Sequence, residues 1–168
     1  MSLTFVLGGA RSGKSRHAEE LVERLAPPWT YIATAEAHDA EMAERIALHR
    51  SRRAEDWHTL DAPHDLATAL AGLPADRPVL VDCLTLWLTN RMLAGADVAA
   101  ESAALAAALG ACKAPLVVVS NEVGLGIVPD NALARRFRDA QGRLNQMVAE
   151  KADRVIFMVA GLPMRVKG

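Results

Sequence analysis

The feature that most constrains the fold of this 168-residue chain is a glycine-rich stretch near its start. Its sequence, GGARSGKS at residues 8–15, fits the pattern G-x-x-x-x-G-K-S. It directly follows an apolar run at 3–7 and precedes a stretch with helical spacing at 14–25. A strand, a glycine turn and a helix in this order predict an α/β fold, with the turn at the end of a sheet strand.

Five short apolar runs recur along the chain, and stretches with helical spacing separate them. The runs are continuous rather than alternating, as is typical of parallel strands covered by helices on both faces. This alternation of strand and helix predicts one doubly wound α/β domain over residues 1–168, with a mostly parallel sheet flanked by helices. The expected strands are 3–7, 29–33, 79–81, 116–119 and 154–160, and the expected helices are 14–25, 39–53, 65–73, 99–111 and 132–152.

Charge and composition narrow the classes of partner. The chain has 19 basic and 20 acidic side chains, so no overall positive field favours nucleic acid or an anionic membrane. No apolar run approaches the roughly 20 residues of a membrane-spanning helix, and the first residues resemble no secretory signal. Cys83 and Cys112 lie in apolar surroundings that favour buried thiols. We therefore expect a cytoplasmic protein that binds neither nucleic acid nor a membrane.

The glycine-rich stretch has the composition of a phosphate-binding loop. Its glycines let backbone N–H groups turn towards an anion, and the following helix adds the positive end of its dipole. Lys14 is expected to reach the β- and γ-phosphates of a nucleotide, and the Ser15 hydroxyl to ligate Mg²⁺. This context favours nucleotide binding over a glycine turn that happens to precede Lys-Ser. The predicted contacts are Gly8, Gly9, Ala10, Arg11, Ser12, Gly13, Lys14 and Ser15.

Two acidic residues follow apolar runs. Asp82 comes directly after the run at 79–81, and a carboxylate at the carboxyl edge of a parallel sheet faces the same crevice as the phosphate loop. We therefore expect Asp82 to bind metal or substrate; a helix-capping or turn role is the alternative, because Thr85 and Asn90 follow. Glu122 opens onto the same edge, where a binding role and a structural hydrogen bond are equally compatible with its position.

A histidine stands among four arginines at 45–53, in the sequence RIALHRSRR. Helical spacing puts His49 on one face with the apolar Met42, which favours an ordinary helix position beside a solvated basic surface. The alternative is chemical, since a neutral imidazole can attack phosphorus and arginines can bind phosphate bidentately. Trp57 and Asp61 follow, and they suit either a purine contact or packing and a turn.

The other histidines carry less weight. His17 lies one turn into the first predicted helix and is expected to be structural. His38, His58 and His64 lie in polar surroundings, so solvent exposure is expected for each.

Together, the motifs resemble one family, the bifunctional adenosylcobinamide kinase/adenosylcobinamide-phosphate guanylyltransferases of cobalamin biosynthesis. The resemblance spans nearly the whole chain, and its most particular segments are NEVGLGIVP at 121–129 and the His-Arg-x-x-Arg…Trp-x-Thr pattern at 49–59. It implies a RecA-like P-loop NTPase fold and a homotrimer. It also implies two reactions: ATP or GTP phosphorylates the aminopropanol hydroxyl of (adenosyl)cobinamide, and GMP is then transferred from GTP to that phosphate, with release of pyrophosphate.

The resemblance also assigns roles to residues. The second reaction of the family passes through a guanylyl-histidine enzyme, and His49 is the matching residue. Asp61 stands where the family usually has Glu. The expected metal ligands are Ser15 and Asp82, and Mg²⁺ is expected to arrive with GTP or ATP. Besides the phosphate loop, the implied nucleotide contacts are Ala33, Thr34, Ala35, Arg50, Ser51, Arg52, Arg53, Asp61 and Asp82.

Two other functions fit part of the sequence. A P-loop small-molecule kinase of another pathway would use the phosphate loop and Asp82 but would give His49 no covalent role. A regulatory or assembly subunit that hydrolyses nucleotide slowly would need no phosphoryl acceptor. The family resemblance favours nucleotide and corrinoid substrates over both.

Overall fold

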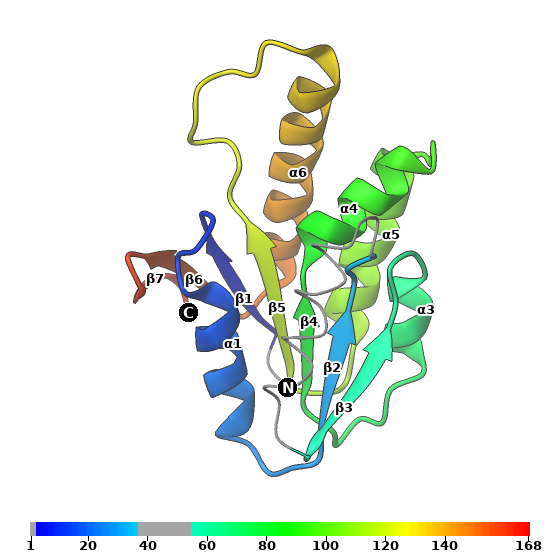
Figure 1. The fold of residues 1–168 in the computed structure, drawn as a ribbon. Helices are drawn as coiled ribbons and strands as arrows, with labels where there is room; N and C mark the ends of the chain where they lie inside the picture. Colours follow the sequence, from blue (N-terminus) through cyan, green and yellow to red (C-terminus); the bar gives the residue numbers. More distant parts are fainter. Residues whose placement is uncertain (1–2, 37–54) are drawn as a thin grey trace.

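The computed structural model describes residues 3–36 and 55–168. A seven-stranded sheet forms its centre, with helices on both faces (Figure 1). The strands are β1 (Leu3–Gly8), β2 (Trp29–Ala33), β3 (Trp57–Asp61), β4 (Val79–Asp82), β5 (Leu116–Asn121), β6 (Arg154–Val159) and β7 (Leu162–Lys167). The helices are α1 (Lys14–Glu23), α3 (Leu66–Ala71), α4 (Leu84–Leu93), α5 (Val98–Ala111) and α6 (Ala132–Lys151).

The strand order is β3-β2-β4-β5-β1-β6-β7, and only the β6–β7 pair is antiparallel. The mostly parallel α/β sheet predicted from the sequence is therefore confirmed. All five predicted strands are present, whereas β3, α4 and β7 were not predicted. In β3 only Trp57 is buried, and every residue of β7 is exposed, so neither strand carries the continuous apolar run of a central strand. The helix predicted at 39–53 lies outside the described residues.

The missed helix α4 follows β4 almost without a break. Its sequence, LTLWLTNRML, buries side chains around most of its circumference, including Leu84, Trp87 and Asn90. A helix covered on most sides lacks the polar stripe that marks an amphipathic helix, so its spacing carries little signal. This helix proves important, because it packs beside the carboxyl ends of β2 and β4.

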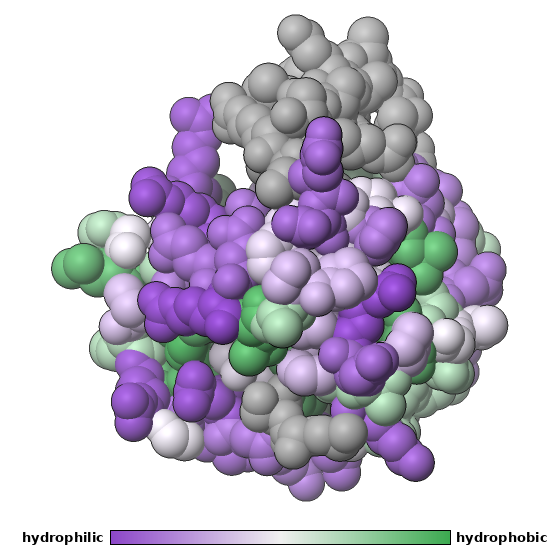
Figure 2. All heavy atoms as spheres, turned by 90° about the horizontal axis from the view of Figure 1, so that it is seen from below, coloured by the Kyte–Doolittle hydropathy of each residue, from purple (hydrophilic) through white to green (hydrophobic). Residues whose placement is uncertain are grey.

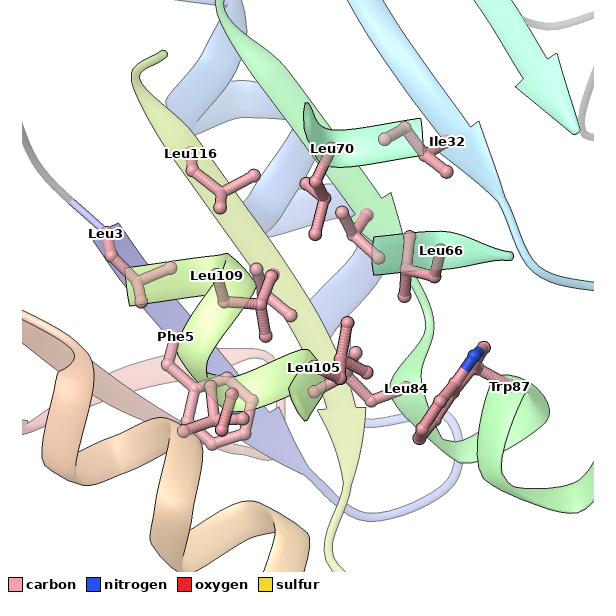
Figure 3. Close-up of a cluster of buried hydrophobic side chains, with 14 of the residues drawn as sticks. Leu3, Phe5, Ile32, Leu66, Leu70, Leu84, Trp87, Leu105, Leu109 and Leu116 are labelled. Atoms are coloured by element: carbon pink, nitrogen blue, oxygen red, sulfur yellow. The ribbon is translucent and has the colours of Figure 1, made fainter. Parts of the chain in front are cut away.

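Both faces of the sheet are covered, which explains the continuous apolar runs. Along β4, Val79 and Val81 point into the cluster under α3–α6, whereas Leu80 points into a smaller cluster under α1. Figure 3 shows the larger cluster, in which Leu105 and Leu109 of α5 face the sheet side chains. Each fully buried Leu or Phe contributes about 1.5–3 kcal/mol relative to an exposed one, so this layer holds α5 firmly.

The carboxyl ends of the six parallel strands meet at one edge of the sheet. Gly8 pairs with Asn121 across β1 and β5, and Ala33 lies between Asp61 and Asp82 in the register of β3, β2 and β4. The molecule seen from below, at the opposite end, presents mainly hydrophilic residues with scattered hydrophobic ones (Figure 2). Among the described segments, no helix is both long and apolar enough to pass through a bilayer.

Candidate active site

The glycine-rich loop forms the turn between β1 and α1 at the carboxyl edge. Gly13 precedes α1 with φ of 90°, a left-handed conformation that a residue with a side chain adopts only with strain. A Cβ on Gly8 would stand 2.5 Å from the Ser12 hydroxyl oxygen, because the loop folds closely over the end of β1. Both positions therefore require glycine for the loop to close in this shape.

Lys14 crosses the inside of the loop. Its side chain is buried, and Nζ donates a hydrogen bond to the carbonyl oxygen of Gly9 at 2.9 Å. Burial lowers the pKa of the Lys14 amine, and the negative charge of Asp82 partly opposes this effect. A desolvated cation of this kind gains stability from a nearby anion, so the loop presents a positive group where a phosphate would lie.

Two other strands brace the loop from the sides. The backbone N–H of Glu122, after β5, donates to the Gly8 carbonyl at 3.0 Å, and the N–H of Gly161 donates to the Ser12 carbonyl at 3.1 Å. Gly161 lies in the tight turn of the β6–β7 hairpin. The hairpin therefore supports the loop from its outer side, a role that the sequence did not predict.

The predicted metal ligands offer the donor set that Mg²⁺ prefers. Ser15 lies in the first turn of α1 and is half-buried, and Asp82 ends β4 at the same edge. The Tyr31 hydroxyl donates to Oδ2 of Asp82 at 3.2 Å, which holds the carboxylate in place. A hydroxyl and a carboxylate, completed by phosphate oxygens, match the oxygen coordination of Mg²⁺ with nucleotides. The residues present therefore fit the ion.

The capping alternative for Asp82 is not what the structure shows. The residue that precedes α4 is Cys83, and its side chain makes no capping hydrogen bond. The Asp82–Cys83 peptide bond is cis. Burial, reinforced by the negative charge of Asp82, raises the pKa of the Cys83 thiol to about 11, so this thiol is neutral at physiological pH.

The three residues expected after β2 lie beside Asp82. Thr34 is fully buried; its hydroxyl donates to the Cys83 carbonyl at 2.7 Å and accepts from the Cys83 N–H at 2.8 Å. Ala33 is buried and Ala35 half-buried. The structure thus brings these residues to the same edge as Asp82, and the Thr34 hydroxyl joins β2 to the start of α4.

Asp61 and Trp57, at the two ends of β3, differ in environment. Asp61 is exposed at the carboxyl edge, opposite Ala33, and lines a hollow of about 400 Å³ between β3 and α3. Trp57 is buried against Trp29 and Tyr31, with ring centroids 5.3 and 6.1 Å away. Trp57 therefore packs in the core, which is one of the two roles that the sequence allowed for it. Asp61 stays accessible to a ligand.

The structure shows one of the two interactions considered for Glu122. Its Oε1 accepts a hydrogen bond from the backbone N–H of Gly124 at 2.6 Å, which closes a tight turn just after β5. This is the structural hydrogen bond that the sequence left open. His49, Arg50, Ser51, Arg52 and Arg53 lie outside the described residues, and their roles stay predictions.

A buried polar network behind β5 was not predicted. Gln141 and Asn145 stand one turn apart on α6; Gln141 Nε2 donates to Ser120 Oγ at 3.0 Å, and Ser120 Oγ donates to Asn145 Oδ1 at 2.8 Å. Asn145 Nδ2 donates to the carbonyl of Asn121, and the Asn121 N–H donates to Thr85 Oγ1. The network fixes the backbone of Asn121 beside Gly8. Its only signal in the sequence is an amide pair with helical spacing in the last helix.

The expectation of solvent exposure is wrong for His64. His58 is exposed on β3, but His64 is half-buried and contacts Glu36 and Arg91. The contacting residues lie 28 and 27 positions away in the chain, so polar sequence neighbours gave no hint of them. His17 on α1 is half-buried, and burial lowers its pKa.

The fold, the glycine-rich loop and the acid at the end of β4 define the class of P-loop nucleotide-binding proteins. The solved structure titled "Crystal structure of the RadB recombinase" has a similar fold, with a TM-score of 0.53, 14% identity, and coverage of 93% of this chain and 73% of that chain. At this identity the likeness supports the fold alone.

The particular family follows from the sequence comparison. Residues 4–166 match the family described as "Cobinamide kinase / cobinamide phosphate guanyltransferase", and the chain belongs to this family. It is 51% identical to the "Bifunctional adenosylcobalamin biosynthesis protein CobP" of Pseudomonas aeruginosa, over 97% of this chain and 96% of that protein. It is 43% identical to the protein CobU of the same description from Salmonella typhimurium, over 98% of this chain and 99% of that protein.

Proposed function

We propose that the chain is a bifunctional adenosylcobinamide kinase and adenosylcobinamide-phosphate guanylyltransferase of cobalamin biosynthesis, with both reactions in one domain over residues 1–168. The observation that carries the proposal is the family match over residues 4–166. The phosphate loop with Lys14 buried inside it, and Asp82 at the neighbouring strand end, support it. The substrates are ATP or GTP and a corrinoid.

In the kinase step, the aminopropanol hydroxyl oxygen attacks the γ-phosphorus, the bond between this phosphorus and the β,γ-bridging oxygen breaks, and the nucleoside diphosphate and the hydroxyl proton are released. The loop N–H groups and the Lys14 amine hold the phosphates and balance the charge that develops on their oxygens. Ser15 and Asp82 would hold Mg²⁺, which neutralises phosphate charge when it is bound. The backbone N–H groups of Glu122 and Gly161 donate hydrogen bonds to the carbonyls of Gly8 and Ser12. These bonds keep the two carbonyls turned away from the nucleotide.

In the guanylyl step, a nitrogen of the neutral His49 imidazole attacks the α-phosphorus of GTP, and pyrophosphate leaves. A phosphate oxygen of adenosylcobinamide phosphate then attacks the same phosphorus, and the P–N bond to His49 breaks. Arg50, Arg52 and Arg53 would balance the phosphate charge, with Ser51 between them. Ala33, Thr34, Ala35 and Asp61 complete the proposed nucleotide contacts, and the carboxyl-edge positions of these four described residues support this assignment.

The decisive test uses GTP labelled at the α-phosphorus. The wild-type protein is expected to become covalently labelled, and the adduct should be acid-labile and alkali-stable, as a phosphoramidate is. His49→Ala should abolish the label, whereas His58→Ala, at an exposed histidine of β3, should keep it. If no adduct forms over a wide range of Mg²⁺ concentrations, the guanylyl-histidine step is excluded. The remaining function would be a P-loop kinase without a covalent nucleotidyl step.

A cytoplasmic homotrimer is part of the proposal, and the resemblance of the sequence to the family supports it. Size-exclusion chromatography with light scattering measures the oligomeric state directly. A mass three times that of one chain is expected, and a monomer or dimer would contradict the trimer without affecting either reaction.

A further inference from the structure

Asn121 is the last residue of β5, the strand that lies between β1 and β4 (Figure 1). It pairs with Gly8, where the phosphate loop begins, and it lies two residues beyond Val119, the partner of Asp82 on β4. Adjacent strands of a sheet are about 4.8 Å apart. The start of the loop, Asn121 and Asp82 therefore lie on three neighbouring strands at the carboxyl edge.

The strand pattern directs the Asn121 side chain to the face of the sheet that carries α1. Successive side chains of a strand point to opposite faces. In β5, Val119 packs in the cluster under α1, and Ser120 points the other way, where its hydroxyl bonds to a side chain of α6. Asn121 therefore points to the α1 face. In β4, Leu80 packs in the cluster under α1, so Asp82 points to the same face.

The phosphate loop folds over this same face and leaves a polar group free there. A Cβ on Gly8, the strand partner of Asn121, would stand 2.5 Å from the Ser12 hydroxyl oxygen, so Ser12 lies beside Asn121 within about one strand spacing. Ser12 is only 9% exposed, and its hydroxyl has no hydrogen-bond partner among the described residues. A buried hydroxyl without a partner costs free energy, which a bound ligand would recover.

Two side chains hold the backbone of Asn121. Thr85 Oγ1 accepts from its N–H at 2.8 Å, and Asn145 Nδ2 donates to its carbonyl at 3.1 Å. Asn145 is itself fixed, because it shares the buried Ser120 hydroxyl with Gln141. Such a polar network stiffens the core around it. The half-buried carboxamide of Asn121, in contrast, makes no hydrogen bond within residues 3–36 and 55–168. The backbone is held, and the side chain is left for a ligand.

We propose that Asn121 is a catalytic residue of the kinase step, in which its Nδ2 donates a hydrogen bond to an oxygen of the γ-phosphoryl group of ATP or GTP. This inference deepens the proposed function and rests on it. Lys14 and the ion at Asp82 would hold the γ-phosphate from two sides, and Asn121 stands on the strand between them. A neutral amide adds a fixed donor at this place without a further charge to desolvate.

The affinities for two nucleotides separate this contact from a structural role. Calorimetry with Mg²⁺ on the full chain compares ADP with β,γ-imido-ATP, a non-hydrolysable analogue that carries the third phosphate. Asn121→Ala should weaken the analogue about tenfold, as expected for one hydrogen bond to a charged group, and should change the affinity for ADP less than about twofold. Asn131→Ala, at an exposed asparagine, is the matched control and should change neither. Equal weakening of both nucleotides by Asn121→Ala, or weakening of neither, would overturn the inference.

Asn121→Asp gives a second test that does not depend on the folding of Asn121→Ala, because it keeps the shape of the side chain. It replaces the donor with an acceptor and puts a negative charge beside the phosphates, so kcat for cobinamide phosphorylation should fall about a hundredfold or more, against about tenfold for Asn121→Ala. A structural role predicts the reverse order, and that order would overturn the inference.

The two tests also distinguish the inference from the proposed function. If the wild-type protein does not phosphorylate cobinamide, the proposed kinase function fails. The comparison of ADP with β,γ-imido-ATP still decides whether Asn121 contacts the γ-phosphate, because this comparison needs no cobinamide. If the wild-type protein phosphorylates cobinamide and Asn121→Ala leaves both the rate and the nucleotide affinities unchanged, the inference alone fails.

Discussion

The carboxyl edge of the sheet holds two regions that are built in opposite ways. The phosphate loop is local: the Lys14 amine binds a carbonyl five residues away, and glycines at Gly8 and Gly13 allow the turn. The region after β2 is assembled at a distance: Thr34 binds residues 49 and 56 positions away, and Glu36 binds one 28 positions away. Consecutive residues can encode the first region, whereas only the completed fold brings the second together.

The two regions also differ in what their side chains contribute to stability. Folding lowers the pKa of the Lys14 amine, so the native state binds this proton less tightly than the unfolded chain does. The charged amine therefore opposes folding at neutral pH, and this effect disappears as the pH rises above the ordinary pKa of lysine. Asn90, in contrast, satisfies two buried carbonyls. Substitution of Lys14 should therefore affect chemistry more than stability, whereas substitution of Asn90 should lower stability.

The largest effect is expected from Lys14→Ala, which removes the cation inside the phosphate loop. The rate of cobinamide phosphorylation should fall about 10²–10³-fold, because a preorganised charge at the developing phosphoryl oxygens is lost. The melting temperature should stay the same or rise, because a desolvated charge is removed. Steady-state kinetics and thermal unfolding measure both quantities.

Lys113→Ala, at an exposed lysine before β5, is the control and should leave both quantities unchanged. A kinase rate that survives Lys14→Ala would remove this residue from its proposed role. A large drop in melting temperature would contradict the separation of chemistry from stability in the loop.

Asn90→Leu should have the opposite effect to Lys14→Ala: it should lower stability. The substitution keeps the branched shape of the side chain but leaves the carbonyls of Thr34 and Pro63 without their donor, at a cost of about 2–3 kcal/mol in the free energy of unfolding. Chemical denaturation measures this change. Asn131→Ala, which removes an exposed cap of α6, is the comparison and should cost about 1 kcal/mol. If Asn90→Leu lowered the free energy of unfolding no more than Asn131→Ala does, the Asn90 contacts would stabilise the protein no more than a surface cap.

Cysteine labelling gives the smallest signal and reports whether the second region is closed. The raised pKa of Cys83, about 11, leaves little thiolate at pH 8, and the side chain is buried. Iodoacetamide should therefore modify Cys83 at least about tenfold more slowly than the half-buried Cys112, as followed by peptide mass spectrometry. In denaturant the two rates should converge. Equal rates in the native protein would mean that the region around Thr34 opens readily.

The predictions from sequence succeeded where neighbouring residues carry the signal. The central strands were recognised because both faces of the sheet are covered, which makes their sequences continuously apolar. The packing of Trp57 and the tight turn at Glu122 were each foreseen as one of two alternatives. Helix α4 and the edge strands β3 and β7 were missed because α4 is buried on most sides and the two strands are mostly exposed.

The sequence by itself determined the phosphate loop, the α/β class and the position of Asp82 at a strand end, because each depends on a few consecutive residues. Only the tertiary structure decided which distant side chains hold those groups: the β6–β7 turn behind the loop, the amides of α6 behind β5, and Arg91, His64 and Glu36 in one line. The reason is geometric. A hydrogen bond between residues 21 or more positions apart depends on the packing of whole helices against the sheet, and no local pattern records it.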